Sequence, residues 1–314
     1  MSRPHTLFGG AMIGTSFTTP EQVQALLDLL KTLGVDRIDT AARYSPTAPG
    51  SSECLLGETR AAEQAFTIDT KINTVSGVRA GTLTAAAIEK SLEESLSRLQ
   101  MSKVNILHFH RPDPQTPIVK QAAEIHRQYL ACRFDKFGLS NFPPELVANF
   151  ISVYEEKGYV KPTVYQGLYS LLSRESEEAL LPLLRKHNIA FTAYSPLAGG
   201  FLTGRATRGD AEGTRYGQSS QFANNPLIAK YKTPEMHAAM ADLLGTLEPL
   251  GIAGSEACLR WLYPYYHSAL SEDDGVILGA SKTPQIVQNM TDISKGPLPT
   301  EVLQKIDSLW EKVV

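Results

Sequence analysis

The chain has little cysteine and no long apolar run, and both shortages limit where it works. Its three cysteines, Cys54, Cys132 and Cys258, lie far apart in a chain of 314 residues, so they predict no disulfide framework and favour a reducing compartment. No stretch approaches the ~18 consecutive apolar residues of a membrane span. The N-terminal residues MSRPHTLFGGAMIG lack the basic start and apolar run of a signal peptide. We therefore expect a cytoplasmic protein with no membrane partner.

The chain also lacks an excess of charge of one sign. Thirty Lys and Arg residues stand against 33 Asp and Glu, for a net charge of −3, and no basic block is long enough to follow a phosphate backbone. We expect no nucleic-acid partner. The 42% of hydrophobic residues and 20% of charged residues exclude a disordered or collagen-like chain and suffice for a large core.

Short apolar runs alternate with amphipathic segments through most of the sequence, which is the pattern of βαβ units and a parallel sheet. The expected strands are Thr6 to Met12, Arg37 to Asp39, Ala65 to Lys71, Val104 to Phe109, Phe134 to Leu139, Thr163 to Gln166, Ala190 to Tyr194 and Gly275 to Leu278. Eight repeats of strand and helix favour an α/β protein with a closed (β/α)8 TIM barrel, in a single domain over residues 1–314. The alternative is an open doubly wound sheet, although no GxGxxG follows the first strand as a Rossmann fold requires.

Polar residues and prolines mark where the intervening helices are expected to begin. The expected caps are Thr19 before Pro20, Ser51 or Ser52, Thr82 or Thr84, Thr116 before Pro117, and Asn141 before Pro143 and Pro144. In the segment Thr84 to Leu99, apolar or small residues recur every three or four positions with charged residues between them. This spacing predicts a helix on the surface of the barrel.

Two features interrupt the repeat. About 40 residues rich in Gly, Ser, Asn and Thr separate Tyr194 from a helix near Pro234, and a loop of this length inside a domain is usually functional. After the last strand, Thr283 to Ile293 and Pro299 to Val313 predict two further helices. The final helix either covers one end of the barrel or joins a second copy in a homodimer, and the sequence leaves both open.

Reactive residues fall where the expected strands end, which is the face of an α/β barrel that carries the chemistry. Asp39 ends the second strand, Lys71 the third, and His110 follows the fourth, while Tyr44 lies in the loop after Asp39. An ammonium group favours a nearby phenolate, so Lys71 is expected to lower the pKa of Tyr44 and make it a usable acid near neutral pH. Asp39 would keep Lys71 charged, and His110 would polarise a carbonyl oxygen.

Taken singly, each of these residues also has an ordinary structural interpretation, as a cap, a solvated strand end, a surface aromatic or a backbone-bonded histidine. Four of them at one barrel face favour catalysis. His108 shares a strand face with His110, and the HxH spacing is compatible with zinc. No third ligand of matching kind stands out, so we expect no metal.

At these residues the chain resembles the aldo-keto reductases, and within them the branch of aflatoxin-aldehyde and succinic-semialdehyde reductases. The segments that carry the resemblance, in this order, are FGGAMIG, IDTAARYS with SSECLLG, IDTK, LHFHRPD, FGLSNF, VYQGLYS, AYSPLAGGFLTGR and VILGASKTPQIVQN. They span nearly the whole chain. The resemblance implies a barrel that binds NADPH without a Rossmann fold, and a catalytic tetrad of Asp39, Tyr44, Lys71 and His110 in which Tyr44 donates the proton.

The resemblance also implies where the cofactor binds. The carboxamide of the nicotinamide would meet Ser140, Asn141 and Gln166, and its ring would stack on Tyr194. The pyrophosphate would lie along Ser195 to Arg205, including Leu197, Gly199, Gly200 and Leu202, where glycine lets the backbone approach phosphate. The 2′-phosphate would lie by Gly279, Ser281, Lys282, Gln285 and Asn289, at a helix N-terminus, with Arg215 in reach.

The resemblance implies a small-molecule carbonyl substrate, and in the residues expected to bind that substrate the chain departs from the branch. A loop arginine pairs with the substrate carboxylate in the acidic-aldehyde reductases, whereas this chain has Lys230 at the nearest position and no terminal arginine. Tyr216 and Phe222 favour an aromatic or bulky aldehyde. The alternative function is a nucleotide-binding regulatory subunit resembling channel β subunits, but the chain reaches its first strand at once, without their long N-terminal segment. A barrel with a decayed site is opposed by the complete tetrad.

Overall fold

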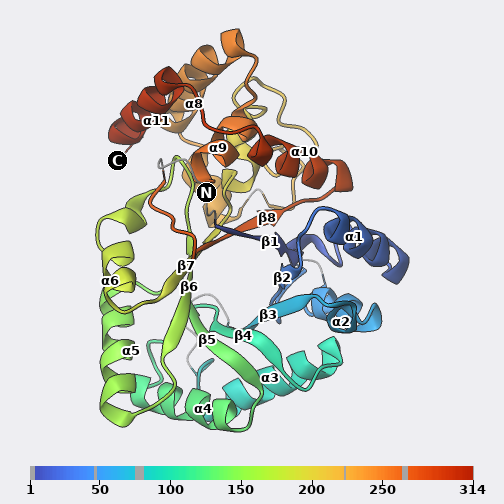
Figure 1. Cartoon of the computed structure of the whole chain (residues 1–314), viewed down its shortest axis with the longest axis vertical. Coiled ribbons are helices and arrows are strands. Elements are labelled where there is room, and N and C mark those ends of the chain that lie inside the picture. Colours follow the sequence, from blue (N-terminus) through green and yellow to red (C-terminus); the bar gives the residue numbers. More distant parts are fainter. Residues whose placement is uncertain (1–3, 46–47, 75–80, 223, 264–267, 314) are drawn as a thin grey trace.

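Eight parallel strands close into a barrel in sequence order within the part of the chain that the structure describes (Figure 1). This computed structural model describes residues 4–45, 48–74, 81–222, 224–263 and 268–313. The strands are β1 (His5–Gly9), β2 (Arg37–Asp39), β3 (Thr67–Ile72), β4 (Val104–Phe109), β5 (Phe134–Ser140), β6 (Pro162–Leu168), β7 (Ala190–Tyr194) and β8 (Gly275–Gly279). Pairing of β1 with β8 closes the ring, which confirms the (β/α)8 barrel and makes the open-sheet alternative wrong.

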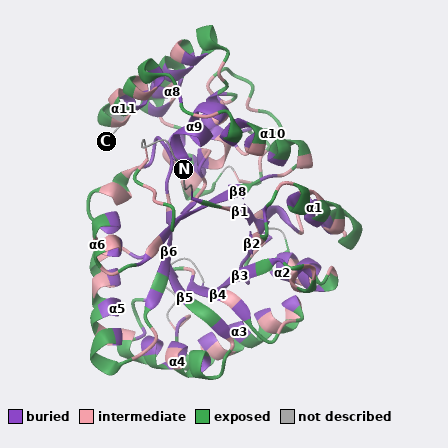
Figure 2. Ribbon diagram, in the orientation of Figure 1, coloured by how far each residue is buried: buried purple, intermediate pink, exposed green. Residues whose placement is uncertain are grey.

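Helices follow the strands and form the outer ring. They are α1 (Pro20–Thr32), α2 (Ser51–Glu58), α3 (Ala85–Leu99), α4 (Ile118–Leu130), α5 (Pro144–Lys157) and α6 (Leu180–Lys186). The strands are mostly buried, and the helices alternate buried and exposed residues (Figure 2). In α3, Ile88 and Leu92 are buried while Glu93 and Glu94 are exposed, as the spacing predicts.

The helix starts are only partly as predicted. Thr19 and Thr84 are N-caps whose hydroxyl oxygens accept from the backbone N–H three residues on. Thr116 and Asn141 are not caps, because α4 and α5 begin after Pro117 and Pro143 instead. The Thr116 hydroxyl donates to Asp113, so a loop contact takes the side chain that the cap would have used.

The first strand is shorter than predicted. It ends at Gly9, and Gly10–Met12 form a 3-10 turn. The carbonyl oxygen of Gly10 accepts from the backbone of Ile13 and from the hydroxyl of Ser52, so it cannot continue the barrel ladder. This turn brings the start of the chain against α2, under the loop that carries Tyr44.

The segment after β7 is long and partly ordered into short helices. A 3-10 stretch, η4, covers Ala198–Thr203, and helices follow at α7 (Pro226–Tyr231), α8 (Pro234–Leu247) and α9 (Gly254–Leu262), all before β8. After β8 come α10 (Thr283–Ser294) and α11 (Thr300–Val313), at the predicted places. No helix in the described residues has the length and apolar character to cross a membrane.

The final helix packs inside the chain. α11 lies alongside α8 (Figure 1), with Val302, Ile306 and Leu309 buried and Lys305 paired to Asp242 at 2.7 Å. The apolar face of α11 is therefore covered by its own chain, whereas a homodimer stays a prediction.

Candidate active site

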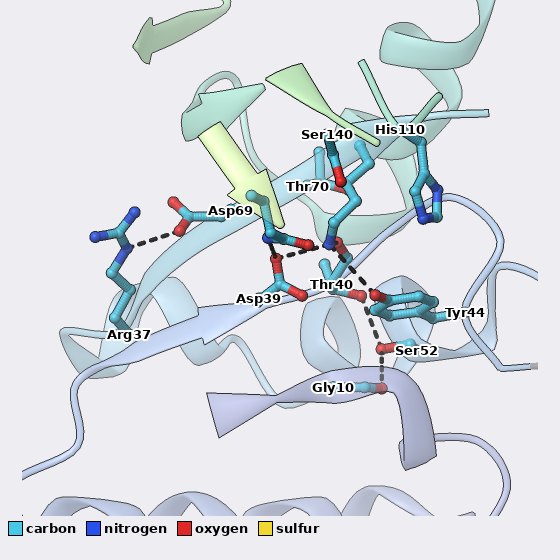
Figure 3. Close-up of polar contacts among 12 residues, drawn as sticks. Gly10, Arg37, Asp39, Thr40, Tyr44, Ser52, Asp69, Thr70, His110 and Ser140 are labelled. Atoms are coloured by element: carbon cyan, nitrogen blue, oxygen red, sulfur yellow. Dashed lines mark hydrogen bonds and ion pairs between the residues drawn. The ribbon is translucent and has the colours of Figure 1, made fainter. Parts of the chain in front are cut away.

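Three residues of the expected tetrad, Asp39, Tyr44 and His110, lie close together (Figure 3), and the fourth, Lys71, contacts the first two. Lys71, on β3, is fully buried, and its Nζ donates to Asp39 Oδ1 at 2.6 Å, to the Thr40 carbonyl oxygen at 2.8 Å and to the Tyr44 hydroxyl at 3.4 Å. An ammonium group has three protons, so these partners use all its donors. Lys71 is thus fixed behind Tyr44 and acts on other groups through it.

Buried charge at Lys71 is balanced by Asp39. Burial alone lowers the pKa of Lys71, but the Asp39 carboxylate and the Tyr44 oxygen outweigh burial and hold that pKa above its ordinary value. Gln166, on β6, donates from Nε2 to Asp39 Oδ1 at 2.8 Å. The lysine therefore stays charged at neutral pH, as the sequence predicted.

Tyr44 differs from the expectation in one respect. Burial raises the pKa of its phenol, while Lys71 and, more weakly, Arg215 lower it, and burial wins. The prediction that Lys71 lowers the pKa of Tyr44 overall is wrong, because it ignored desolvation of the phenolate. The phenol therefore holds its proton at neutral pH in the free protein.

His110 lies edge-on to Tyr44, with ring centroids 6.1 Å apart and planes at 81°. Burial, followed by the charges of Lys71, Arg111 and Arg43, puts the pKa of His110 well below its ordinary value. The imidazole is therefore neutral at pH 7, with one N–H to donate. Its backbone is fixed from the next strand, because Asn141 Nδ2 donates to the His110 carbonyl oxygen at 3.0 Å.

A second layer of polar residues supports the tetrad, and the sequence did not predict it. The hydroxyls of Thr40 and Ser52 lie 2.8 Å apart, and Ser52 donates to Gly10 at 2.9 Å (Figure 3). The backbone N–H of Gly50 donates to the Tyr44 carbonyl oxygen at 2.8 Å. These hydrogen bonds therefore connect the start of α2 with the end of β2 around Tyr44. The sequence predicts Ser51 or Ser52 as the cap of this helix, but both lie inside α2 and Gly50 is its N-cap.

Glu53 is also missed by sequence reasoning. It is fully buried on α2, where it accepts from the hydroxyl of Thr70 and pairs with Arg98 Nε at 2.8 Å. Thr70 directly precedes Lys71, so this contact links α2, α3 and the strand that carries the lysine. A buried carboxylate in an otherwise ordinary helix start has no sequence signal except its place on the inward face.

The residues expected to hold the nicotinamide meet at the ends of β5, β6 and β7. Asn141 Nδ2 donates to Ser140 Oγ at 3.0 Å, and its Oδ1 accepts from the Tyr194 hydroxyl at 2.8 Å. Gln166 is the residue that contacts Asp39. The end of β6 therefore links this polar group to the tetrad.

The segment after β7 turns tightly. Ser195, Ala198, Gly199 and Gly200 all have positive φ, from 51° to 100°, and a Cβ added to Gly200 would meet nothing within 4 Å. Leu197 lies within this turn and is partly buried, and Leu202 is buried in the core. Arg205 is exposed and pairs with Asp210 at 2.7 Å.

The start of α10 is already capped by its own side chain. Gln285 Oε1 accepts from the backbone N–H groups of Ser281 and Lys282 at 2.9 and 3.2 Å. Asn289, one turn further, is buried. Gly279 is exposed at the end of β8, with open space around its Cα. The two backbone N–H groups at the start of this helix are therefore already bonded to Gln285.

The loop residues assigned to phosphate or substrate have partners of their own. Arg215 lies over the ring of Phe222, at 4.9 Å from its centroid, and its positive charge contributes to lowering the pKa of Tyr44. Tyr216 is buried, and its hydroxyl donates to the Ala198 carbonyl oxygen at 2.6 Å. Lys230 pairs with Glu175 at 2.5 Å. Of the three expected substrate residues, Phe222 is the one with a partly exposed, apolar side chain, whereas the polar groups of Tyr216 and Lys230 already have partners.

His108 lies deeper, in the barrel interior. It is buried, in register with Lys71, and so close to Gly138 that a Cβ there would lie 2.3 Å from His108 Cδ2. Burial, then Lys71 and Arg37, lower the pKa of His108 well below its ordinary value. Among the described residues, no three His, Cys, Asp or Glu side chains are grouped to hold a metal.

Comparison with known proteins agrees with this geometry. A protein-family model described as "Aldo/keto reductase family" matches residues 7–311. Oxidoreductase sirO of Leptosphaeria maculans is 34% identical over 297 residues, covering 94% of this chain and 87% of that protein. Aflatoxin B1 aldehyde reductase member 2 of Rattus norvegicus is 32% identical over 328 residues (99% and 86%), and human aldo-keto reductase family 7 member A3 is 31% identical over 335 residues (99% and 95%).

Proposed function

Because the chain belongs to the aldo/keto reductase family and is an oxidoreductase acting on carbonyl groups, we propose that it reduces an aldehyde or ketone to an alcohol, with hydride from NADPH and a proton from Tyr44. The observation that carries this proposal is Lys71, whose ammonium group is held between Asp39 and the Tyr44 hydroxyl. A buried lysine with all its donors used has no free proton to give to a substrate. It can stabilise the phenolate that forms when Tyr44 donates.

The proposed cofactor fits the strand ends. Ser140, Asn141 and Gln166 offer the hydroxyl and amide groups that a carboxamide requires, and Tyr194 offers an aromatic face beside them. The open space at Gly200 and Gly279 leaves the backbone accessible where phosphates would pass. When bound, NADPH supplies the hydride to the carbonyl carbon.

The protein groups divide the remaining work. Tyr44 holds the proton at its hydroxyl until the carbonyl oxygen gains negative charge, since burial keeps its pKa above the ordinary value. The neutral imidazole of His110 can donate one hydrogen bond to the same oxygen and so orient the carbonyl. Asp39 and Thr40 keep Lys71 in place throughout.

We propose NADPH over NADH because Lys282, with Ser281, Gln285 and Asn289, stands at the start of α10, where a 2′-phosphate would find a cation and, in place of Gln285, could accept from two backbone N–H groups. Arg215 remains a candidate for this phosphate, although in the free protein it packs on Phe222 near Tyr44. Replacing Arg215 separates its two roles. If Arg215 binds the 2′-phosphate, the variant has a changed Kd for NADPH, and if it lines the substrate pocket, the variant has a changed KM for the carbonyl compound.

The substrate we propose is aromatic or bulky. Phe222 offers a partly exposed ring beside Arg215, whereas Lys230, the position that would meet a carboxylate in the acidic-aldehyde branch, is already paired with Glu175. Burying one aromatic ring stabilises a complex by about 1.5–3 kcal/mol, and a partly solvated ion pair contributes about 0–1 kcal/mol.

A panel of aldehydes, ketones and diketones, scored by NADPH consumption, tests the function. We expect turnover of aromatic aldehydes that requires the nucleotide. Tight binding of NADPH with no turnover of any carbonyl would instead support the regulatory-subunit function.

A further inference from the structure

Glu53, on α2, is a fully buried carboxylate outside the expected tetrad. Its Oε1 accepts from the hydroxyl of Thr70 at 2.5 Å, and its Oε2 accepts from Arg98 Nε at 2.8 Å. A buried ion pair is often no more stabilising than apolar residues of the same size, because desolvation of the charges offsets their attraction. Its hydrogen bonds are directional, however, and both carboxylate oxygens are used. Glu53 is therefore suited to hold its two partners at fixed positions.

One partner of Glu53 lies next to the lysine of the tetrad. Thr70 directly precedes Lys71 on β3, and successive side chains of a strand point to opposite faces of the sheet. Lys71 accordingly points toward Asp39 in the barrel interior, while Thr70 points outward to α2. The bond between Glu53 and Thr70 thus fixes the strand at the residue adjacent to the lysine.

The start of α2 also holds the loop that carries Tyr44. The backbone N–H groups of Gly50 and Ser52 donate to the Tyr44 carbonyl oxygen at 2.8 and 3.4 Å. Gly50 lies against the side chain of Arg98, since a Cβ added to this glycine would be 3.2 Å from Arg98 Cδ. The start of α2 therefore connects the Tyr44 loop to Glu53 and, through its carboxylate, to β3.

The direct links between the Tyr44 loop and the lysine are long. The Thr40 N–H donates to the Asp69 carbonyl oxygen at 2.8 Å, but two residues on, the Ala42 N–H donates to the Lys71 carbonyl oxygen at 3.3 Å, beyond the usual range for such bonds. Lys71 Nζ reaches the Tyr44 hydroxyl at 3.4 Å. The distance between the ammonium group and the phenol thus depends on what else holds the two segments together.

Glu53 is not needed to keep α2 against α3. A Cβ added to Gly57 would be 2.1 Å from the Arg98 carbonyl oxygen, so the two helices are in close backbone contact one turn beyond Glu53. This contact involves neither the carboxylate of Glu53 nor the hydroxyl of Thr70. Loss of the bond between those two groups should therefore loosen β3 against α2 without separating the helices.

We propose that Glu53 is a positioning residue for carbonyl reduction. By bonding Thr70 while α2 holds the Tyr44 loop, it sets the distance between the Lys71 ammonium group and the phenol. This inference rests on the proposed reductase function, and the fully buried Glu53 acts through these neighbours. A misplacement of about 1 Å can lower a catalytic rate about a hundred-fold, and here it would move the positive charge away from the phenolate that forms.

Thr70→Val tests the proposal, because it removes the hydroxyl and keeps the size of the side chain and the pair between Glu53 and Arg98. With an aromatic aldehyde and NADPH, we expect kcat to fall by about ten-fold or more, while KM and the Kd for NADPH stay within about two-fold of wild type. Thr70→Ser keeps the hydroxyl and should retain most of kcat. Glu53→Ala should lower kcat as much as Thr70→Val does, and the double variant should lose no more than either single variant, because both remove one link.

The matched control is Thr59→Val, which removes a hydroxyl bond to the Leu55 carbonyl oxygen at the other end of α2 and should leave kcat unchanged. Urea unfolding of each variant measures stability separately. If Glu53→Ala does not fold, the threonine variants decide alone.

A kcat within about two-fold of wild type in Thr70→Val would overturn the proposal. An equal loss of kcat in Thr70→Ser or in Thr59→Val would overturn it too, since the loss would then follow general disturbance of the region rather than the bond to Glu53. No turnover of any aldehyde by the wild-type protein would instead overturn the reductase function on which the proposal rests.

Discussion

Gln166 Nε2 and Lys71 Nζ both donate to one oxygen of Asp39, Oδ1, at 2.8 and 2.6 Å. The carboxylate is therefore shared between the lysine behind Tyr44 and a residue of the proposed nicotinamide site. This link makes β6 part of the catalytic frame. It also means that changes at Asp39 disturb the lysine and the cofactor end together.

Tyr44→Phe should abolish carbonyl reduction and leave NADPH binding within a few-fold of wild type. The hydroxyl is needed only when the carbonyl oxygen takes its proton, so the loss falls on kcat. Steady-state turnover and fluorescence titration of NADPH measure the two effects. If the variant kept more than about a tenth of wild-type turnover, Tyr44 would not be the acid.

Asp39→Asn should destabilise the fold by about 3–5 kcal/mol, because it leaves the buried ammonium of Lys71 without its counter-charge. The double variant Asp39→Asn with Lys71→Met should recover much of that stability and no activity. Urea unfolding of the two variants and of Lys71→Met gives the coupling energy. A double variant as unstable as the sum of the singles would show that the pair is not coupled.

Stability should fall as the pH drops below about 6.5, the ordinary pKa of histidine. Burial depresses the folded-state pKa of His108 and of His110, so the unfolded chain binds protons that the folded chain does not. Stability from such groups is present above the unfolded pKa and is lost as the pH falls toward the folded pKa, by up to about 1.4 kcal/mol per pH unit for each histidine.

The variant His108→Gln isolates this effect, since His108 is buried in the barrel and outside the tetrad. Unfolding free energy measured between pH 5 and pH 8 should have a shallower slope in the variant. His5→Gln, which changes a histidine with an exposed side chain at the start of β1, is the control for the substitution itself. An unchanged slope in His108→Gln would mean that this histidine is protonated in the folded protein.

Lys282→Ala should weaken NADPH binding by ten-fold or more and leave NADH binding nearly unchanged, because a charge-assisted bond to the 2′-phosphate contributes roughly 1.5–3 kcal/mol. Lys312→Ala, which removes an exposed lysine from α11, is the matched control. Titration of both nucleotides settles the matter. Equal Kd values for NADPH and NADH in the wild-type protein would remove the phosphate site from α10.

Phe222→Ala should lower kcat/KM for aromatic aldehydes by about ten-fold or more, the loss of one buried ring, and change that for succinic semialdehyde little. Lys230→Ala should have almost no effect on either, since Glu175 already pairs with the lysine. Steady-state kinetics with both substrates measure the difference. A preference for succinic semialdehyde that disappears in Lys230→Ala would return the protein to the acidic-aldehyde branch.

Sequence reasoning located the barrel and grouped the tetrad because both depend on strong local patterns. Apolar runs at regular spacing predict strands, and polar residues at their carboxyl ends predict a site there. The residues it missed, Thr40, Ser52 and Glu53, act through contacts between elements, and nothing in their neighbours distinguishes them from caps. The net pKa of Tyr44 was also beyond reach, since it depends on how much of the phenol is buried.

Some predicted helix starts are wrong for a similar reason. Thr116 is of a residue type that commonly caps helices, but its hydroxyl donates to Asp113 instead, because the loop places that carboxylate beside it. The apolar residues up to Met12 predict a longer first strand. In the structure the Gly10 carbonyl oxygen accepts from the hydroxyl of Ser52, and the strand ends at Gly9.

The tetrad comes from β2, β3 and β4, while the long loop with Phe222 lies beyond β7 and is followed by α8, against which α11 packs. The proposed proton donor and the proposed substrate contact thus lie in different thirds of one chain. Exchanges confined to residues 216–222 should change the proposed substrate contacts without touching Lys71, its partners or the residues proposed for the cofactor. Exchange of this loop between relatives would therefore test whether substrate choice can be changed independently of the tetrad.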